Sequence, residues 1–219
     1  MGDRVAIVVG AGPGVGQAVA RRFARENFKV GLIARRPETL EQQRAELEKT
    51  GYRAKARAAD AGDASALTAA IRALAAELGP PTVLIYNAAA LRQSKASEVS
   101  QEALLQDFKV NVTGAIAAVQ AVLPGMRKLG KGTILFTGGG LSLDPHPQYA
   151  SLALGKAGIR SVALSLSKEL EPEGIHVATV TICGIVKAGT RFDPDRIAED
   201  YLRLHLQGKG GYEREMVWR

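Results

Sequence analysis

The 219-residue sequence contains only one cysteine, Cys183, so it cannot form an internal disulfide. A chain without disulfides suits a reducing compartment, and we expect a cytoplasmic protein. There is no apolar run of about 18 residues or more and no charged-then-apolar leader, which argues against a membrane span and a signal peptide. The histidines, His146, His176 and His205, are scattered. They form no metal-ligand spacing with the cysteine, and we expect no metal site and all three rings at surface or turn positions.

The net charge of +7 raises the question of a nucleic-acid partner. The lysines and arginines are spread in ones and twos, without interleaved aromatic residues and without a basic tail. We therefore expect a solvated basic surface that attracts phosphorylated ligands, with no specific nucleic-acid site. A nonspecific nucleic-acid binder is the least favoured alternative, and its retention on DNA would vanish at modest salt.

Glycine is concentrated in one segment near the start of the chain. The apolar run 5–9 leads into Gly10-Ala11-Gly12-Pro13-Gly14-Val15-Gly16, and a helical repeat of apolar residues follows. This pattern predicts a buried strand, a tight turn and a helix whose free N–H groups suit a pyrophosphate. The spacing Gly-x-Gly-x-x-Gly fails at Val15, and the absence of a lysine after the loop excludes an ATP-type P-loop. The observed spacing favours a dinucleotide site, with a purely structural turn as the alternative.

The second apolar run, 28–34, is followed by Arg35-Arg36 and then by Pro37, where a helix would begin. In a dinucleotide fold the end of this strand meets the adenosine ribose. An acidic residue there binds the 2′-hydroxyl, whereas arginine accommodates a 2′-phosphate. Two adjacent guanidinium groups without an acid favour NADP over NAD, although NAD stays possible and the arginines could simply be solvated.

Strand-like and helix-like patterns alternate along the chain with no linker-like stretch or internal repeat. The expected strands cover residues 5–9, 28–34, 52–60, 82–86, 132–136, 175–182 and 216–218. The longest helical repeats cover about 101–128 and 149–170, and the last helix begins at Asp193-Pro194. The sequence therefore predicts one domain over residues 1–219 with an α/β fold, a doubly wound parallel sheet of the Rossmann type in three layers, α/β/α.

Over most of its length the sequence resembles the short-chain dehydrogenase/reductase family. The segments that carry the resemblance are 10–16, Asp60, Asn87-Ala88-Ala89, Asn111, Lys156-Ala157-Gly158 and Cys183-Gly184-Ile185-Val186. The resemblance implies hydride transfer between a nicotinamide cofactor and a carbonyl or alcohol. It also implies that Asn111 holds a water in a proton relay, that Lys156 binds the nicotinamide ribose, and that the chain forms a homodimer or homotetramer. The residues expected at the cofactor are Gly10, Gly12, Pro13, Gly14, Val15, Gly16, Arg35, Arg36, Asp60, Ala61, Asn87, Ala88, Ala89, Lys156, Gly184 and Val186.

The sequence departs from the family pattern at two of the four catalytic positions. The family's tyrosine lies four residues before its lysine, and here that position is Leu152. The family's serine lies further upstream, where this chain has Gly138-Gly139-Gly140. Leucine transfers no proton and glycine has no hydroxyl, and the loss of a positioned general acid typically costs about 10²–10⁴-fold in rate. The ordinary carbonyl-reductase mechanism therefore does not carry over unchanged.

Tyr149 is the first candidate to replace the missing phenol, because it lies about one helical turn before Leu152. It is about 10 Å from Lys156 along a regular helix axis, which is too far for the usual tyrosine–lysine coupling. The alternative is that Tyr149 only starts the helix and closes the site. Ser142, His146 and Ser151 are weaker candidates.

The glycine run has a second interpretation. Missing side chains at a strand end would open space beside the nicotinamide, and Leu152 would make that space apolar. This predicts a bulky or apolar small-molecule substrate, or a hydride transfer that needs little proton assistance. Neighbouring side chains that already fill the space would count against it.

We therefore expect an NADP-preferring oxidoreductase with an altered proton-transfer group, whose catalytic residues are Asn111, Lys156 and Tyr149. The alternative is a non-catalytic dinucleotide-binding sensor or a subunit of a larger assembly, which the missing tyrosine and serine would explain.

Overall fold

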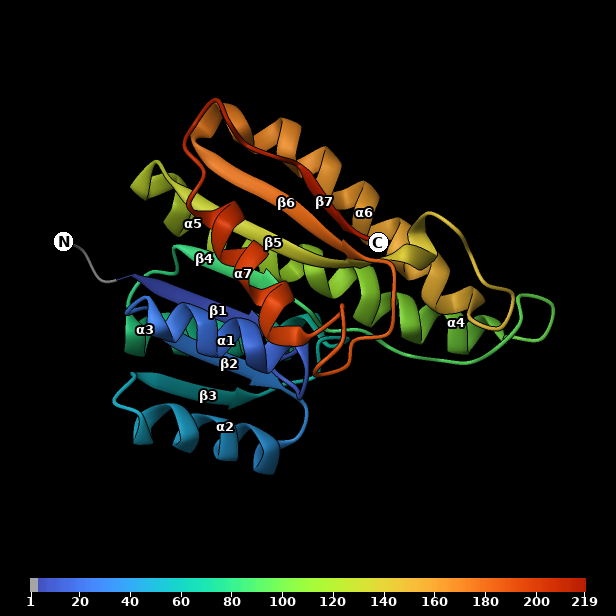
Figure 1. Cartoon of the computed structure of the whole chain (residues 1–219), viewed down its shortest axis with the longest axis horizontal. Coiled ribbons are helices and arrows are strands. Elements are labelled where there is room, and N and C mark those ends of the chain that lie inside the picture. The colour runs from blue at the N-terminus through green and yellow to red at the C-terminus, as the bar shows by residue number, and fades with distance from the viewer. Residues whose placement is uncertain (1–3) are drawn as a thin grey trace.

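The computed structural model describes residues 4–219, and these form a seven-stranded sheet in which every neighbouring pair of strands is parallel. The strand order is β3-β2-β1-β4-β5-β6-β7 (Figure 1). The strands are Val5–Val9 (β1), Lys29–Ala34 (β2), Ala54–Ala58 (β3), Val83–Tyr86 (β4), Gly132–Gly139 (β5), Ile175–Ile182 (β6) and Glu215–Trp218 (β7). The chain winds outward from β1 in both directions, and this confirms the predicted doubly wound fold.

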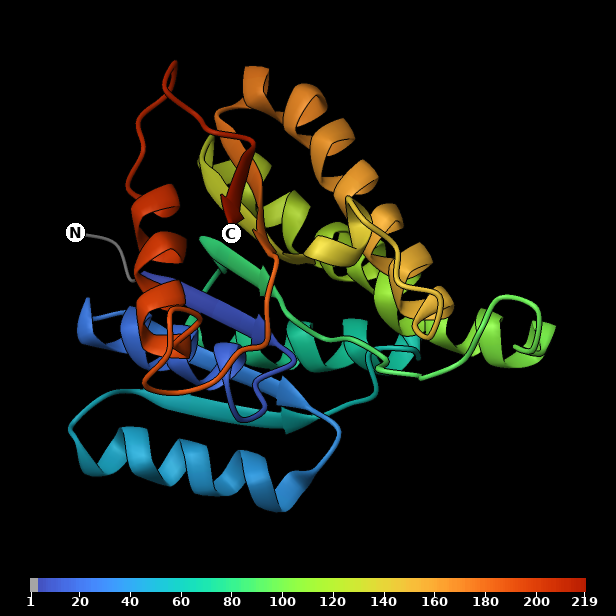
Figure 2. The same ribbon diagram turned by 45° about the vertical axis from the view of Figure 1, so that its right-hand side comes forward.

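Helices cover both faces of the sheet (Figures 1 and 2). The helices are Val15–Arg25 (α1), Pro37–Lys49 (α2), Ala64–Leu78 (α3), Gln101–Phe108 (α4), Gly114–Leu129 (α5), Ala150–Leu170 (α6) and Pro194–His205 (α7). One apolar core joins α3, α5 and α6 to one face of the sheet, and a second joins α1, α2 and α7 to the other face. Three layers, α/β/α, follow from these two cores.

Strand β1 shows why both faces must be covered. All five of its residues are buried, with Val5, Ile7 and Val9 in one core and Ala6 and Val8 in the other. Successive side chains of a strand point to opposite faces. A continuous apolar run is therefore stable only where helices pack on both sides of the sheet. At the sheet edge, Ala54 of β3 is buried and Ala56 half-buried, whereas the basic residues Lys55 and Arg57 are exposed, as expected for an edge strand.

Side-chain caps and proline set two of the helix starts. The Asp63 carboxylate accepts hydrogen bonds from the backbone N–H groups of Ser65 and Ala66, and these bonds hold its pKa below the ordinary value. Asp193 caps α7 in the same way, with Pro194 in the first turn. Both arrangements satisfy N–H groups that a helix start leaves without a partner.

The structure corrects three expected boundaries and connections. Strand β5 continues past Phe136 through Gly139, because Thr137, Gly138 and Gly139 stay in register with β6. The predicted long helix 101–128 is divided into α4 and α5 by a π-helical turn at Lys109–Thr113. Strand β3 is shorter than 52–60. Among residues 4–219, no helix is both long enough and apolar enough to cross a membrane.

The expectation that all three histidines lie on the surface or in turns is wrong for His176, and His205 is a partly buried residue of helix α7. His176 lies inside β6 and is buried. Its Nδ1 is 3.0 Å from the carbonyl oxygen of Leu204, its Nε2 is 2.7 Å from that of Glu213, and its ring stacks on Tyr212. Both partners are carbonyl acceptors, so a neutral ring can donate to only one of them, and the ring is also held by its stacking on Tyr212.

His205, at the end of α7, makes stability sensitive to acid. Its ring packs against both Phe23 and Phe28, which also contact each other, and its Nδ1 is 2.9 Å from Thr133 Oγ1. Burial, with smaller effects of Arg4 and His176, lowers its pKa from 6.5 to about 4. Between these values the unfolded chain binds a proton that the folded chain does not, so stability falls as pH drops from 6.5 toward 4. The whole pKa difference between the folded and unfolded chain corresponds to roughly 3 kcal/mol in the free energy of unfolding.

The free energy of unfolding, measured with urea, should therefore differ less between pH 7 and pH 5 for His205→Gln than for the wild type. His146→Gln, at an exposed histidine, is the matched control and should keep the wild-type difference. An unchanged pH difference in His205→Gln would contradict this assignment.

Candidate active site

Two adjoining cavities lie at the carboxyl ends of the strands. One has a volume of about 760 Å³ and the other about 1160 Å³. They share Pro13, Asn87, Ala89 and Leu91 in their linings, so they form one groove that passes over the end of β1 and β4. Open α/β sheets bind ligands at this edge, next to the point where the strand order reverses.

The glycine-rich turn forms the floor where the two cavities meet. Gly10 and Gly14 have φ angles of +84° and +95°, which side chains rarely tolerate. A Cβ on Gly10 would collide with the backbone of Ala88, and one on Gly16 would collide with the Gly10 carbonyl oxygen. By contrast, Gly12 has open space around its Cβ position. The turn thus exposes bare backbone and the N-terminus of α1 to the groove.

Asn87 connects this turn to β4. Its Nδ2 donates to the Gly10 carbonyl oxygen at 2.8 Å, and its backbone N–H donates to the Val9 carbonyl oxygen at 2.8 Å. The small residues Ala88 and Ala89 follow and line the smaller cavity. Segment 87–89 therefore anchors the glycine-rich turn to β4, and its small side chains leave its own backbone accessible to a ligand.

The far end of the smaller cavity is lined by Arg35, Arg36, Asp60 and Ala61. Both arginines are exposed, and within residues 4–219 neither has a hydrogen-bond or ion-pair partner. The Asp60 carboxylate accepts a hydrogen bond from the Gly62 N–H at 2.8 Å, which fixes the loop after β3. This end of the groove is a basic pocket with two free guanidinium groups.

Asn111 lies in the π-helical turn and is 4 % exposed. Its Oδ1 accepts a hydrogen bond from the Ala90 N–H at 2.8 Å, so the side chain fixes the segment that follows β4. Gly155 of α6 lies so near that a Cβ there would be 2.6 Å from the Asn111 side chain. Among the described residues, Asn111 is not one of those that line the larger cavity.

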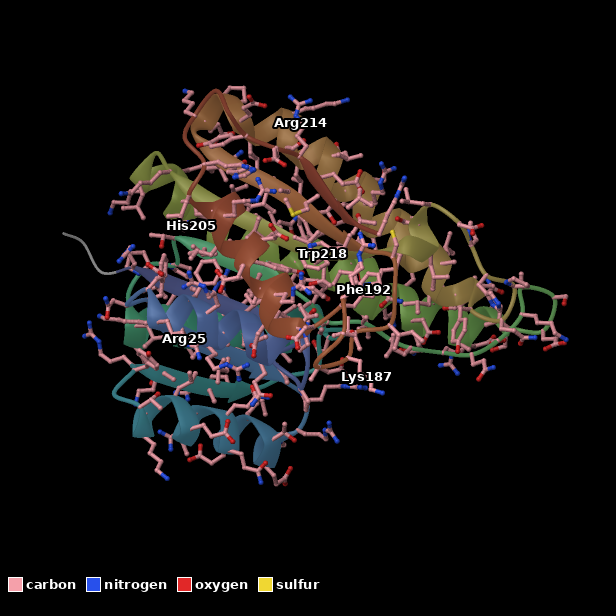
Figure 3. The ribbon with its side chains drawn as sticks, in the orientation of Figure 1. Arg25, Lys187, Phe192, His205, Arg214 and Trp218 are labelled. Carbon is pink, nitrogen blue, oxygen red and sulfur yellow. The ribbon has the colours of Figure 1, made fainter. Side chains whose placement is uncertain are left out.

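Lys156 projects from α6 into the larger cavity. Its Nζ donates to the Thr137 carbonyl oxygen at 2.8 Å. Burial lowers its pKa from 10.5 to about 8. Gly184 and Val186 line the same cavity, and Phe192 (Figure 3) packs so tightly on Gly184 that no Cβ could be placed there.

The groove therefore brings together the glycine turn, the two arginines, Asp60, the segment 87–89, Lys156, Gly184 and Val186. A model of the short chain dehydrogenases matches residues 4–196, which is well over half of the chain. The chain belongs to this family. As a short-chain dehydrogenase it is a nucleotide-dependent oxidoreductase, and a purely non-catalytic binding protein is not favoured.

Individual relatives agree with this assignment. The chain is 29 % identical over 187 residues to 2,3-dihydro-2,3-dihydroxybenzoate dehydrogenase from Bacillus subtilis, covering 85 % of this chain and 69 % of the relative. A short-chain dehydrogenase structure from Rhodopseudomonas palustris is 30 % identical with a TM-score of 0.91, covering 100 % of this chain and 99 % of that one. A metagenomic short-chain oxidoreductase in complex with NADP is 25 % identical with a TM-score of 0.90, covering 99 % and 96 %.

In this short-chain dehydrogenase the larger cavity has an apolar side chain, Leu152, one helical turn before Lys156. Leu152 is 7 % exposed and lines the larger cavity, as does Lys156. Tyr149 lies at the start of α6, with its ring centroid 5.7 Å from that of His146. Tyr149 is not among the residues that line this cavity in the described chain. The structure thus brings Leu152 and Lys156 together at the cavity and leaves Tyr149 beside it.

The glycine run and Leu152 both line the larger cavity, but the positions where side chains are missing are closely surrounded. A Cβ on Gly138 would lie 2.7 Å from the hydroxyl oxygens of Thr179 and Thr181. One on Gly139 would lie 3.3 Å from Lys156 Cε, and one on Gly140 would lie 2.9 Å from Cys183 Cα. A side chain at 138 or 140 would therefore collide with its neighbours, while the glycine backbone itself forms part of the cavity lining.

Sequence reasoning missed a buried carboxylate that positions the start of α6. Arg92 donates to both carboxylate oxygens of Asp107, at 2.7 and 3.2 Å, and Ser151 Oγ donates to one of them at 2.7 Å. Burial alone would raise the pKa of Asp107, but the bonds from Arg92 and Ser151 outweigh it and hold the pKa below the ordinary value. Since Ser151 precedes Leu152, this cluster fixes the wall of the cavity.

Proposed function

We propose that this short-chain dehydrogenase transfers hydride between NADP(H) and the carbonyl or alcohol group of a bulky, apolar small molecule. The observation that carries the proposal is a single groove with free arginines at one end and a buried lysine at the other. When bound, the reduced cofactor supplies a hydride from C4 of its nicotinamide ring. The protein's own residues hold both reactants, exclude water and supply the proton.

The basic end of the groove supports NADP over NAD. Arg35 and Arg36 have no competing partners in the described chain, and adjacent guanidinium groups suit the dianionic 2′-phosphate. Asp60 and Ala61 would face the adenine. One structural neighbour is a complex with NADP, which agrees with this preference.

The lining of the larger cavity supports an apolar substrate. Four large hydrophobic side chains that are exposed to solvent line it, namely Leu91, Leu143, Ile185 and Val186. Leu91 is 78 % exposed and Ile185 is 86 % exposed. A cluster of exposed apolar side chains around a cavity marks a ligand site, because a bound apolar body removes them from water.

At the reacting centre we assign cofactor binding to Lys156 and a supporting role to Asn111. Lys156 Nζ keeps N–H donors free for a ribose hydroxyl while it donates to Thr137. Asn111 anchors the backbone at Ala90 and so shapes the wall beside the nicotinamide. The position of Tyr149 supports a role at the start of α6, and a catalytic role would require it to move toward the cavity.

The exposed surfaces of α4, α5 and α6 support a homodimer or homotetramer. Leu105 on α4, Ile116 on α5 and Leu154 on α6 are large apolar side chains exposed to solvent. Their burial between subunits would account for their exposure in one chain. Light scattering on the purified protein measures the number of subunits directly. We further propose a cytoplasmic location, which a single cysteine suits.

A titration with NADPH and NADH, followed by nicotinamide fluorescence, tests the cofactor site. We expect NADPH to bind the more tightly and Gly16→Ala to weaken it at least about tenfold, because its Cβ would displace the Gly10 carbonyl and the turn. Gly125→Ala is the matched control, since its Cβ meets only Pro80 at 4.0 Å, and it should bind normally.

Turnover is then measured at 340 nm with apolar ketones, quinones and alcohols. Tight NADPH binding without turnover of any of them would favour the non-catalytic alternative. Failure to bind either cofactor would overturn the proposed function.

A further inference from the structure

We propose that Lys156 is itself the general acid, giving the proton that the substrate oxygen takes up on reduction. This inference rests on the proposed function and extends it to the proton source. Leu152 occupies the position of the family's tyrosine, so no phenol lies between the lysine and the substrate. The ammonium group is then the proton donor that the α6 wall presents to the cavity.

One hydrogen bond fixes the Lys156 ammonium group and leaves its other N–H groups available for a ligand. Its Nζ uses one N–H on the Thr137 carbonyl oxygen at 2.8 Å, and an ammonium group has three. The stem of the side chain lies along Gly139, where any larger residue would press on Cε. The glycine at 139 therefore makes room for the lysine stem.

The surroundings of Lys156 favour proton release near neutral pH. In the described chain no carboxylate forms an ion pair with it, and burial lowers its pKa to about 8. A general acid works best when its pKa is near the working pH. The other titratable groups lining the same cavity are Cys183, Asp144, His146 and Arg219.

Groups behind the cavity already have partners of their own. Tyr201 shares a hydrogen bond of 2.6 Å with Thr137 Oγ1, and burial raises the pKa of its phenol further from neutrality. Glu215 on β7 is paired with Arg160 and accepts a hydrogen bond from Thr181. His146 is exposed, and its Nδ1 accepts from the Gln148 N–H.

The proposed step balances in atoms and electrons. The carbonyl carbon accepts the hydride from NADPH, its π bond to oxygen breaks, and the oxygen takes a proton from Lys156 Nζ. The products are an alcohol, NADP⁺ and a neutral lysine, which regains its proton from solvent water. In the oxidative direction the neutral amine acts as the base.

The test uses NADPH and 9,10-phenanthrenequinone, an apolar dicarbonyl probe. For the wild type we expect kcat for reduction to fall as pH rises through about 8, where the acid is lost. Lys156→Arg keeps the positive charge but cannot release the proton, so kcat should fall about 10²–10⁴-fold and lose this inflection. Lys168→Arg, an exposed lysine on the same helix, is the control and should behave as the wild type.

A second measurement does not depend on turnover. NMR titration of ¹³C-labelled lysine Cε in the cofactor-free protein should show one resonance with an inflection near pH 8 that is absent in Lys156→Arg. A Lys156 inflection above pH 10 would overturn the inference even if the variant is inactive for other reasons. So would an unchanged pH profile in Lys156→Arg, or loss of the inflection in His146→Ala, which would assign the proton to the histidine. NADPH binding without reduction of any carbonyl probe would instead overturn the proposed function.

Discussion

Replacing Leu152 with tyrosine is expected to raise kcat for ketone reduction by about 10²-fold, the lower end of the range for a well-placed general acid. Residue 152 lies one helical turn before Lys156, and both side chains line the larger cavity. A phenol at this position would stand beside the ammonium group, which favours phenolate and lowers the pKa of the phenol. It would then donate the proton from a position closer to the substrate than the lysine.

Leu152→Phe is the matched control, because it adds the ring without the hydroxyl. Steady-state rates of NADPH oxidation with an apolar ketone should rise for Leu152→Tyr and stay at or below the wild-type value for Leu152→Phe. Equal rates in the two variants would mean that the gain comes from packing, and no gain in either would mean that the proton step does not limit the rate.

Removing both guanidinium groups in Arg35→Ala/Arg36→Ala is expected to weaken NADPH binding about 10²-fold and leave NADH binding nearly unchanged. Hydrogen bonds to charged groups contribute about 1.5–3 kcal/mol each. Because solvent screens exposed charges, we expect the two arginines together to contribute about 3 kcal/mol of binding free energy. A free-energy loss of this size corresponds to about 10²-fold in Kd. The selectivity should also fall with added salt in the wild type, since the contacts are exposed.

Arg25→Ala serves as the control, because this exposed arginine lies at the end of α1 away from the turn (Figure 3). It lowers the net charge without touching the cavity that Arg35 and Arg36 line. Fluorescence titrations of the three proteins with NADPH and NADH separate local recognition from general attraction. Equal losses for both cofactors in the double variant would contradict a 2′-phosphate site.

The fold and the glycine-rich turn in the groove could be predicted because their signals are local. A buried strand such as β1 needs a continuous apolar run, and a turn with positive φ at Gly10 and Gly14 needs glycine. These requirements are visible within a few residues of sequence. The order of such segments along the chain then indicates a doubly wound sheet.

The catalytic half depends on contacts between distant residues. Nothing in the spacing of Arg92, Asp107 and Ser151 indicates that they meet, yet together they fix the start of α6. The three glycines suggested open space, whereas the structure fills their surroundings with Lys156, Cys183 and threonines from β6. Tyr149 stays a prediction as a catalytic residue, because helix spacing alone does not show where a helix begins relative to a cavity, and the structure leaves this residue outside the cavity lining.

Strand β7 has a practical consequence for anyone who modifies this protein. It runs parallel to β6 and delivers Arg219 to the lining of the larger cavity, whereas β1 begins at the opposite, amino-terminal edge of the sheet (Figure 1). A peptide fused after Arg219 would begin at the larger cavity, where it could cover the apolar side chains that we propose bind the substrate. Affinity tags, fluorophores and surface linkers should therefore be joined before β1, because the length of the sheet then lies between them and the groove at the carboxyl ends of the strands.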